Sequence, residues 1–363
     1  MMKILFYINQ IYEGGAERVI TQLASSFADT GHESILVTSF EHPDEYYFSS
    51  KVRRFSLEGK QLEQPRIKRN VSRIQKLRKI IKEEAPDIVL SFMQEPNFRA
   101  LISSFGLPCK NIVSVRNDPK REYAGKVGSF VGKVLIPLLT DGCVFQTKQA
   151  SEWFPERLRE KSSVIPNEVA HVFFETKRSG EENYWVAIGR LTSQKNYPMM
   201  IKAFAEVIKS HPEQKLKIYG AGPQHKELEN LIFRLGLSSS VSLEGQTHDV
   251  PSVLSDAIGF LMTSDYEGMP NALMEAMAMG LPCIATDCPC GGPAELIVDG
   301  ENGFLIATGD EAALSGRVNS VVENHSLRES VGAEAANSMS RFLPEETFAR
   351  WEAYFNRIYG GDA

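Results

Sequence analysis

Lys3-Ile-Leu-Phe-Tyr-Ile-Asn9 begins the pattern that decides the fold of this chain. This short apolar run predicts a buried strand, and a helical pattern from Glu17 to Gly31 and a second strand pattern from Ser34 to Thr38 follow it. Strand, helix and strand in this order predict a parallel sheet with crossover helices. The alternation continues with a basic helix, Val71 to Glu84, and the strand patterns Asp87 to Phe92, Ile112 to Val115 and Ser163 to Ile165.

A second series of the same kind begins at Tyr184. Its strand patterns are Tyr184 to Ile188, Leu216 to Tyr219, Val241 to Leu243, Ile258 to Met262, Pro282 to Ala285 and Phe304 to Ile306. The polar stretch Glu175 to Asn183 separates the two series and is the best linker candidate. A chain of 363 residues can bury two cores, so we expect an α/β protein with two Rossmann-like, doubly wound domains facing a central cleft.

The composition is that of a soluble globular protein, with 42% hydrophobic and 24% charged residues. No apolar run is long enough to span a membrane, and the N-terminal run is too short for a signal peptide, so we expect a cytoplasmic protein. Five cysteines, an odd number, favour reduced thiols over disulfides. Cys288-Pro-Cys290 lacks the further ligands of a zinc site, so no metal site is expected.

Positive charge is concentrated between residues 51 and 82, which carry 12 basic and 2 acidic side chains. This segment has two interpretations of equal weight. It is a solvated helix face, or it is a patch that meets an anionic membrane surface or a phosphorylated acceptor, since each basic residue near such a membrane contributes ~1 kcal/mol. Nucleic acid is the weakest choice, because no recognised binding motif accompanies the charge.

Two carboxylates stand out in the second half, in the stretch Glu267-Gly-Met-Pro-Asn-Ala-Leu-Met-Glu275. Their spacing places Glu267 on a loop and Glu275 about one turn into the following helix. The amides of Gly268, Met269 and Asn271, around Pro270, would lie at the helix N-terminus, where unpaired N–H groups suit a phosphate. A ligand with a diphosphate between two sugars fits this layout.

Glycine-rich turns follow several predicted strands and begin helices, which is where a ligand approaches the backbone. Gly14-Gly15 follows the first strand, Gly220-Ala-Gly222 follows a strand of the second series, and Gly291-Gly292-Pro293 follows the strand after the paired acids. The segment Gly189-Arg190-Leu-Thr-Ser-Gln-Lys195 places two cations on one loop, a combination suited to a diphosphate. Each turn alone could equally be structural, and the two cations could simply be solvated.

In this order the motifs resemble retaining glycosyltransferase family 4. They are Gly14-Gly15-Ala16-Glu17, Gly189-Arg190-Leu191, Lys195-Asn196, Gly220-Ala221-Gly222, Glu267-Gly268 with Glu275, and Gly291-Gly292-Pro293. The resemblance covers nearly the whole chain. It implies a GT-B fold with an acceptor-side N-terminal domain, residues 1–172, a C-terminal domain that binds a nucleotide sugar, residues 183–343, and a last helix, about 344–363, that packs back on the first domain.

The resemblance also implies roles for individual residues. Arg190, Lys195 and Glu267 would be catalytic, with the two cations on the donor diphosphate and Glu267 on hydroxyls of the transferred sugar, while Glu275 would bind the ribose. The remaining donor contacts would come from Gly14, Gly15, Glu17, Arg116, Gly189, Gly222, Gln246, Thr247, Gly268, Met269, Pro270 and Asn271. Many family members have a histidine where this chain has Arg116, which cannot shuttle a proton because it stays charged; a loop brace with Asp118 is its alternative role.

The implied reaction is transfer of a hexose or N-acetylhexosamine, with retention, from a nucleotide-diphosphate sugar. UDP is favoured over GDP and ADP. No Asp-x-Asp occurs in the chain, so we expect a metal-independent enzyme with no cofactor beyond this co-substrate. The expected acceptor is a glycan, in particular a polyprenyl-diphosphate-linked glycan of bacterial surface polysaccharide synthesis, reached peripherally at the inner face of the membrane. A nucleotide-sugar epimerase of similar fold and a non-catalytic sugar-nucleotide-binding protein are the alternatives.

Overall fold

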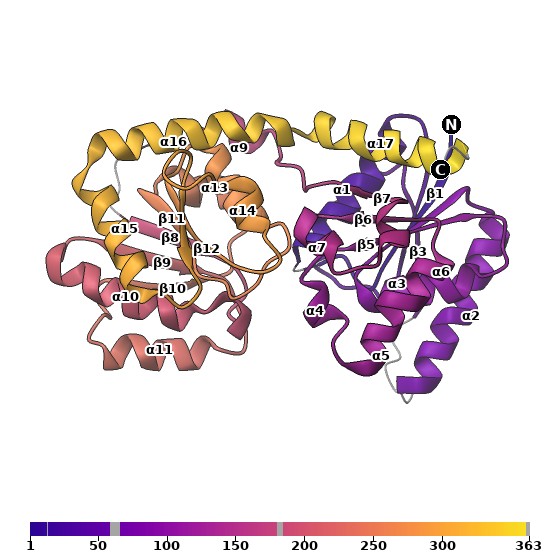
Figure 1. Ribbon diagram of the computed structural model, residues 1–363, viewed down its shortest axis with the longest axis horizontal. Helices are drawn as coiled ribbons and strands as arrows, with labels where there is room; N and C mark the ends of the chain where they lie inside the picture. Colours follow the sequence, from indigo (N-terminus) through magenta and orange to yellow (C-terminus); the bar gives the residue numbers. More distant parts are fainter. Residues whose placement is uncertain (13, 59–65, 180–183, 361–363) are drawn as a thin grey trace. The chain divides into compact units, whose positions relative to one another are not determined.

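The computed structural model describes residues 1–12, 14–58, 66–179 and 184–360, which form two compact units (Figure 1). The first unit is Met1–Asn167 together with the C-terminal segment that starts at Glu345, and the second unit is Glu168–Pro344. Each unit holds one parallel sheet with helices on both faces, so the expected pair of Rossmann-like α/β folds is confirmed.

The sheet of the first unit has seven parallel strands in the order β3-β2-β1-β4-β5-β6-β7. The central strand β1 pairs Lys3 with Glu33 on one side and Ile4 with Ile88 on the other. The strands are β1 (Lys3–Ile8), β2 (Glu33–Thr38), β3 (Arg53–Ser56), β4 (Ile88–Phe92), β5 (Lys110–Val115), β6 (Gly142–Phe145) and β7 (Ser162–Val164). The helices are α1 (Gly15–Asp29), α2 (Arg66–Glu84), α3 (Gln94–Ser104), α4 (Pro119–Glu122), α5 (Gly125–Phe130), the π-helix η1 (Val131–Leu135), α6 (Ile136–Leu139), α7 (Lys148–Glu152), α8 (Glu156–Arg159) and α17 (Pro344–Gly360).

Alternate side chains of β1 point to opposite faces of this sheet, as the period of a strand requires. Phe6 joins the core beneath α1 and α17, whereas Tyr7 joins the core beneath α2 and α3. The C-terminal helix α17 contributes its aromatic face to the first of these cores, with Phe355 stacked on Phe27 at 5.0 Å between ring centroids. Figure 1 shows α17, in yellow, on the same unit as α1.

The sheet of the second unit has six parallel strands in the order β10-β9-β8-β11-β12-β13. They are β8 (Tyr184–Ile188), β9 (Lys215–Tyr219), β10 (Val241–Gly245), β11 (Gly259–Met262), β12 (Cys283–Asp287) and β13 (Phe304–Ala307). The helices are α9 (Val172–Glu175), the 3-10 turn η2 (Ser193–Lys195), α10 (Tyr197–Ser210), α11 (His225–Arg234), α12 (Val250–Ser255), α13 (Asn271–Ala278), α14 (Gly292–Leu296), α15 (Glu311–Glu323), α16 (His325–Met339) and η3 (Ser340–Phe342). Helices α10, α11 and α15 cover one face of the sheet, and α9, α12, α13, α14 and α16 cover the other.

Most predicted strands are present within one or two residues of their expected ends, but β3 and β6 were not predicted. The change between units occurs at Asn167–Glu168, ahead of the predicted linker Glu175 to Asn183, whose last four residues lie outside the described part of the chain. Residues 168–175 belong to the second unit because Val169 and Phe173 are buried in its core. No helix among the described residues is long and apolar enough to cross a bilayer.

Candidate active site

Lys195 and Glu267 form a close ion pair in the second unit, with 2.6 Å between Lys195 Nζ and Glu267 Oε1. Lys195 ends the turn after β8, and Glu267 lies on the loop after β11. Strands β8 and β11 are neighbours, and the order of strands reverses between them, so the pair lies at the topological switch point where open α/β sheets bind ligands. Both residues therefore lie where a ligand site is expected.

The Glu267 side chain is largely buried, and a second side chain, besides Lys195, and a backbone hydrogen bond hold the residue in place. Ser264 Oγ donates to the same oxygen, Oε1, at 2.7 Å, and the Glu267 amide donates to the Pro289 carbonyl at 2.6 Å. Among the described residues, these contacts leave Oε2 for a ligand hydroxyl. Sequence reasoning missed Ser264, because nothing in its neighbourhood separates it from an ordinary serine at a strand end.

Hydrogen bonds between the two loops fix the ion pair. Asn196 has a left-handed backbone, with φ of 46°, and its Nδ2 donates to Asp265 Oδ1 at 2.9 Å. The Asp265 amide donates to the Gln194 carbonyl at 2.8 Å, and Thr263 Oγ1 donates to the Lys195 carbonyl at 3.0 Å. These hydrogen bonds therefore hold the loop that carries Lys195 against the loop that carries Glu267.

Burial beside this pair changes the chemistry of two neighbours. The pKa of the Tyr197 hydroxyl is raised well above its usual range by burial and, secondarily, by the Glu267 carboxylate. Burial and the same carboxylate raise the pKa of the Cys288 thiol to about 12. Both groups are therefore neutral at physiological pH. Tyr197 uses its hydroxyl to donate to the Gly189 carbonyl at 3.0 Å, which makes it a support for the loop.

The glycines of the second unit allow loops to approach one another closely. A Cβ on Gly220 would lie 1.9 Å from the Gly189 carbonyl oxygen, and one on Gly222 would lie 2.4 Å from the Leu191 carbonyl oxygen. A Cβ on Gly292 would lie 1.6 Å from the carbonyl oxygen of Gly268. Gly220 and Gly222 are therefore required for packing against the loop that carries Arg190, and Gly292 is required for packing against the loop before α13. Each of these glycines has a structural reason in addition to any role in ligand binding.

The other predicted donor-binding residues of the second unit differ in exposure. Arg190 is exposed, and among the described residues its side chain makes no ion pair. Glu275 is buried on α13, which begins at Asn271 directly after Gly268, Met269 and Pro270, as predicted. Gln246 and Thr247 follow the edge strand β10, with Gln246 exposed and Thr247 Oγ1 accepting from the Asp249 amide at 3.1 Å.

The glycine turn of the first unit has a local structure of its own. Gly14 is the N-cap of α1, and a Cβ at this position would lie 1.9 Å from the carboxylate of Glu17, so that side chain lies over the turn. Gly15 is exposed at the first position of the helix. The turn follows β1, which is the switch point of the first sheet between β2 and β4.

Arg116 lies in a buried polar cluster after β5. It donates to Asn167 Oδ1, and its guanidinium carbon is 4.4 Å from the centre of the Phe92 ring. Its ion-pair brace with Asp118, the alternative role, is not found among the described residues; Asp118 accepts from the Lys120 amide and pairs with Arg121. Burial lowers the pKa of Arg116 to about 9, and Glu122 opposes this shift, so the guanidinium stays charged at neutral pH.

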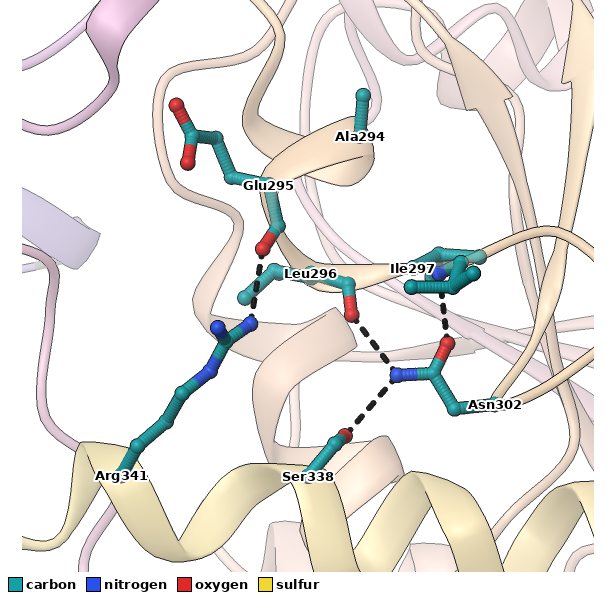
Figure 2. A pocket seen from close by; sticks show the side chains of 8 residues that line it. Ala294, Glu295, Leu296, Ile297, Asn302, Ser338 and Arg341 are labelled. Atoms are coloured by element: carbon teal, nitrogen blue, oxygen red, sulfur yellow. Dashed lines mark hydrogen bonds between the residues drawn. The ribbon is translucent and has the colours of Figure 1, made fainter.

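A cavity of about 280 Å³ in the second unit lies apart from these residues (Figure 2). Several polar groups of its lining bond to one another: Arg341 donates to the Glu295 carbonyl at 2.9 Å, and Asn302 Nδ2 donates to the Leu296 carbonyl at 3.0 Å and to Ser338 at 3.1 Å. No predicted site residue lines it, so this cavity is not part of the candidate active site.

Comparison with known families agrees with the fold and the site. A model described as "Glycosyltransferase Family 4" matches residues 13–170, and a model described as "Glycosyl transferases group 1" matches residues 170–338. Together these models span almost all of the chain, which belongs to the GT-B glycosyltransferases of family 4. It is therefore a glycosyltransferase.

Three similar proteins illustrate the family. The Campylobacter jejuni enzyme named GalNAc-alpha-(1->4)-GalNAc-alpha-(1->3)-diNAcBac-PP-undecaprenol alpha-1,4-N-acetyl-D-galactosaminyltransferase is 26% identical over 97% of each chain. Exopolysaccharide phosphotransferase SCO2592 of Streptomyces coelicolor is 32% identical over 60% of this chain, which spans only 23% of that protein. The crystal structure of Anabaena Alr3699/HepE with UDP and glucose superposes with a TM-score of 0.80 at 20% identity, over 97% of this chain and 98% of that one, a likeness of fold.

Proposed function

We propose that this glycosyltransferase transfers a hexose or N-acetylhexosamine from a UDP-sugar to a lipid-linked glycan in bacterial surface polysaccharide synthesis. The observation that carries the proposal is the Lys195–Glu267 pair at the switch point of the second sheet. In this assignment the second unit, with the predicted domain 183–343, binds the donor, and the first unit, with 1–172 and the last helix, binds the acceptor.

Lys195 and Arg190 would neutralise the donor diphosphate as charge develops on it. The bond between the anomeric carbon and the diphosphate oxygen breaks, the acceptor oxygen bonds to that carbon, and the acceptor proton leaves with the diphosphate. The start of α13 would add to the same stabilisation, because the N-terminus of a helix carries partial positive charge. Preorganised donors of this kind typically contribute ~3 to 4 kcal/mol each to lowering the barrier.

Glu267 would both orient Lys195 and bind the transferred sugar. Its Oε1 accepts from Lys195 and Ser264, which leaves Oε2 to accept from a sugar hydroxyl. Because Oε1 already accepts from two donors, we assign Glu267 to orientation and charge stabilisation rather than to the role of a general base. Glu275 would accept from the ribose hydroxyls, and Gly14, Gly15, Glu17 and Arg116 would complete donor binding from the first unit.

We further propose that the reaction retains anomeric configuration and needs neither metal nor cofactor. The two cations and the helix amides supply the positive charge that a divalent ion would otherwise provide. Assigning the anomer of donor and product by NMR tests retention, and turnover in excess EDTA tests metal independence. A product of inverted configuration, or loss of activity that Mg²⁺ or Mn²⁺ restores, would contradict these two parts separately.

The lipid-linked acceptor is supported by the Campylobacter jejuni relative, whose name specifies a PP-undecaprenol glycan, and by surface features of the first unit. The basic segment 51–82 supports contact with a membrane less strongly than its positive charge led us to expect from the sequence. Arg73 is buried and paired with Glu58 at 2.7 Å, and Lys76 Nζ donates to the Leu57 carbonyl, while residues 59–65 lie outside the described structure. Lys68, Lys79 and Lys82 remain exposed on α2.

A stronger candidate for lipid contact is the continuous helical segment α5–η1–α6. Val127, Phe130 and Leu138 are 79%, 53% and 51% exposed, and residues 125–139 contain two lysines and no acid. Such an apolar stripe with basic flanks suits an anionic membrane interface.

The protein would then work peripherally at the cytoplasmic face of the membrane. Replacing these three residues by serine should weaken binding to phosphatidylglycerol vesicles more than Lys68→Glu with Lys79→Glu does; equal binding by all forms would refute the membrane contact.

A donor screen tests the function as a whole. Purified protein is incubated with UDP-glucose, UDP-galactose and their N-acetylated forms, with and without a prenyl-diphosphate N-acetylhexosamine, and products are identified by mass spectrometry. A transferase adds one sugar to the acceptor. An epimerase would convert the UDP-sugar without any acceptor, and a binding protein would change neither substrate.

A further inference from the structure

A buried arginine holds the residue that follows the first strand. Arg99 of α3 is 3% exposed, and its Nη1 lies 2.6 Å from Asn9 Oδ1. Its Nη2 donates to Glu95 Oε2 at 2.6 Å, and its Nε donates to Asn70 Oδ1 at 3.2 Å. Burying a guanidinium is unfavourable unless its donors are satisfied, so this arrangement fixes the position of Asn9 firmly.

The contact also fixes which end of the Asn9 amide faces outward. Arginine can only donate, so the Asn9 oxygen must face Arg99, and Ser39 Oγ donates to the same oxygen at 3.0 Å. The amide nitrogen Nδ2 therefore points away from both groups. Among the described residues it has no hydrogen-bond partner, and Asn9 is only half-buried.

Asn9 lies where the first sheet is expected to bind a ligand. It directly follows β1, at the switch point between β2 and β4. Across this point, Met93 directly follows β4 with φ of 74°, a backbone conformation that is strained for methionine and that is enriched at functional sites. The Met93 side chain is 36% exposed. A directed amide donor and a strained residue thus mark the same edge of the sheet.

The charge of Arg99 bears on what kind of group Asn9 would meet. Arg99 is paired with the Glu95 carboxylate at 2.6 Å, so the group that Asn9 Nδ2 offers to a ligand is a neutral amide donor and not an unpaired cation. A neutral hydrogen-bond donor suits a sugar hydroxyl, whereas a phosphate would favour an unpaired cation.

We propose that Asn9 Nδ2 donates a hydrogen bond to a hydroxyl of the acceptor sugar and that Arg99 is the residue that positions it. This inference rests on the proposed transfer to a glycan acceptor. Asn9 is then a specificity-determining residue of the acceptor subsite. The wild-type enzyme should prefer the full acceptor over an acceptor that lacks the hydroxyl bound by Asn9.

The test is a cycle of protein and acceptor variants, with the prenyl-diphosphate N-acetylhexosamine that the wild type uses and its monodeoxy analogues as probes. Asn9→Ala should lower kcat/KM for the full acceptor about tenfold, mainly through KM of the acceptor. One monodeoxy acceptor should be about tenfold poorer for the wild type and no poorer than the full acceptor for Asn9→Ala. KM of the donor and slow hydrolysis of the UDP-sugar should be unchanged.

Ser39→Ala is the matched control, because it removes a bond to the same amide oxygen without affecting Nδ2, and it should change kcat/KM less than about twofold. If Asn9→Ala does not fold, the cycle is repeated with Asn9→Ser, which leaves a polar group below Arg99. Equal losses with every acceptor would overturn the inference and make Asn9 a brace of the fold. Failure of the wild type to transfer to any such acceptor would instead overturn the proposed function, and the inference with it.

Discussion

At the scale of single residues, the contact between Lys195 and Glu267 is the feature of the site that was least predictable from the sequence. The order of motifs marked both residues, but they were expected to contact different parts of one ligand, and their contact with each other at 2.6 Å could not be foreseen. Residues 72 positions apart meet only because β8 and β11 are neighbours in the sheet, and sequence patterns do not specify strand neighbours. The same holds for Asn196, which meets Asp265 across the same two loops.

Lys195→Ala should lower kcat about a hundredfold or more, because it removes a preorganised positive charge from the developing negative charge of the diphosphate. The variant should also be less stable than wild type, since Glu267 would stay buried without its cation. Steady-state kinetics and urea denaturation measure the two effects. Lys202→Ala is the control, because Lys202 forms an exposed pair with Glu311 on the same unit and should change neither quantity appreciably. Turnover within a few-fold of wild type would remove Lys195 from the mechanism.

Glu122, near Arg116, provides a residue-scale test of pH dependence. Burial raises the pKa of its carboxyl from 4.5 to about 7, against the opposing effect of a bond from the Gln94 amide and of Arg116. An acid with a raised folded-state pKa binds more protons folded than unfolded between these values, so its contribution to stability falls as pH rises from about 4.5 to 7.

Glu122→Gln removes this titration and keeps an oxygen for the Gln94 amide. The variant should therefore gain stability relative to wild type as pH is raised from 5 to 7, with a constant advantage from pH 8 upward. Denaturant titrations at pH 5, 6, 7 and 8 measure the difference. A difference that is flat across this range would mean that Glu122 is ionised throughout it.

At the scale of elements, the regular alternation of strand and helix patterns made most strands and long helices predictable. The strands that were not predicted, β3 and β6, were missed for physical reasons. Strand β3 is a short edge strand that begins with Arg53 and Arg54, so it merges into a basic stretch that suggests a helix face. Strand β6 has only four residues. The burial of Arg73 against Glu58 also depends on tertiary packing that composition does not reveal.

The C-terminal helix α17 packs on the first unit through its aromatic face, and Tyr354 anchors it there. Its hydroxyl lies 2.7 Å from the Lys161 carbonyl and 3.2 Å from the Cys143 carbonyl, and Gly142 leaves room for it, because a Cβ there would lie 2.3 Å from the hydroxyl oxygen. This one group ties α17 to the strand β6 and to the residue before β7.

Tyr354→Phe should lower the free energy of unfolding of the first unit by about 1 to 2 kcal/mol, because buried carbonyls lose their donor while the ring still packs. Tyr359→Phe is the control, since Tyr359 is 49% exposed on the same helix and should be neutral. Guanidinium titrations followed by tryptophan fluorescence compare the variants, with Trp351 as a reporter in the same core. Equal losses from both substitutions would show that the hydroxyl of Tyr354 does not anchor the helix.

At the scale of the whole molecule, each unit builds its candidate site at the carboxyl edge of its own parallel sheet, beside the switch point. The alternation of strands and helices was sufficient to predict both sheets, and the paired acids were sufficient to indicate a nucleotide sugar as ligand. The acceptor was far less predictable, because its recognition depends on side chains such as Asn9 and Arg99 whose contacts join distant segments of the first unit.

Assignment of the donor to the second unit predicts selective stabilisation of that unit by UDP. A ligand present at about a hundred times its Kd stabilises the state that binds it by about 2.7 kcal/mol, which for a unit of this size raises Tm by roughly 5 to 10 °C. Hydrogen exchange should show the strongest protection in the loops that carry Arg190, Lys195 and Gly268. UMP should protect less than UDP, because it lacks the second phosphate that the cations would neutralise. Since the cations and helix amides replace a metal in this mechanism, excess EDTA should leave the UDP-induced shift unchanged, and a shift that disappears in EDTA and returns with Mg²⁺ would show that the diphosphate is held through a metal ion instead.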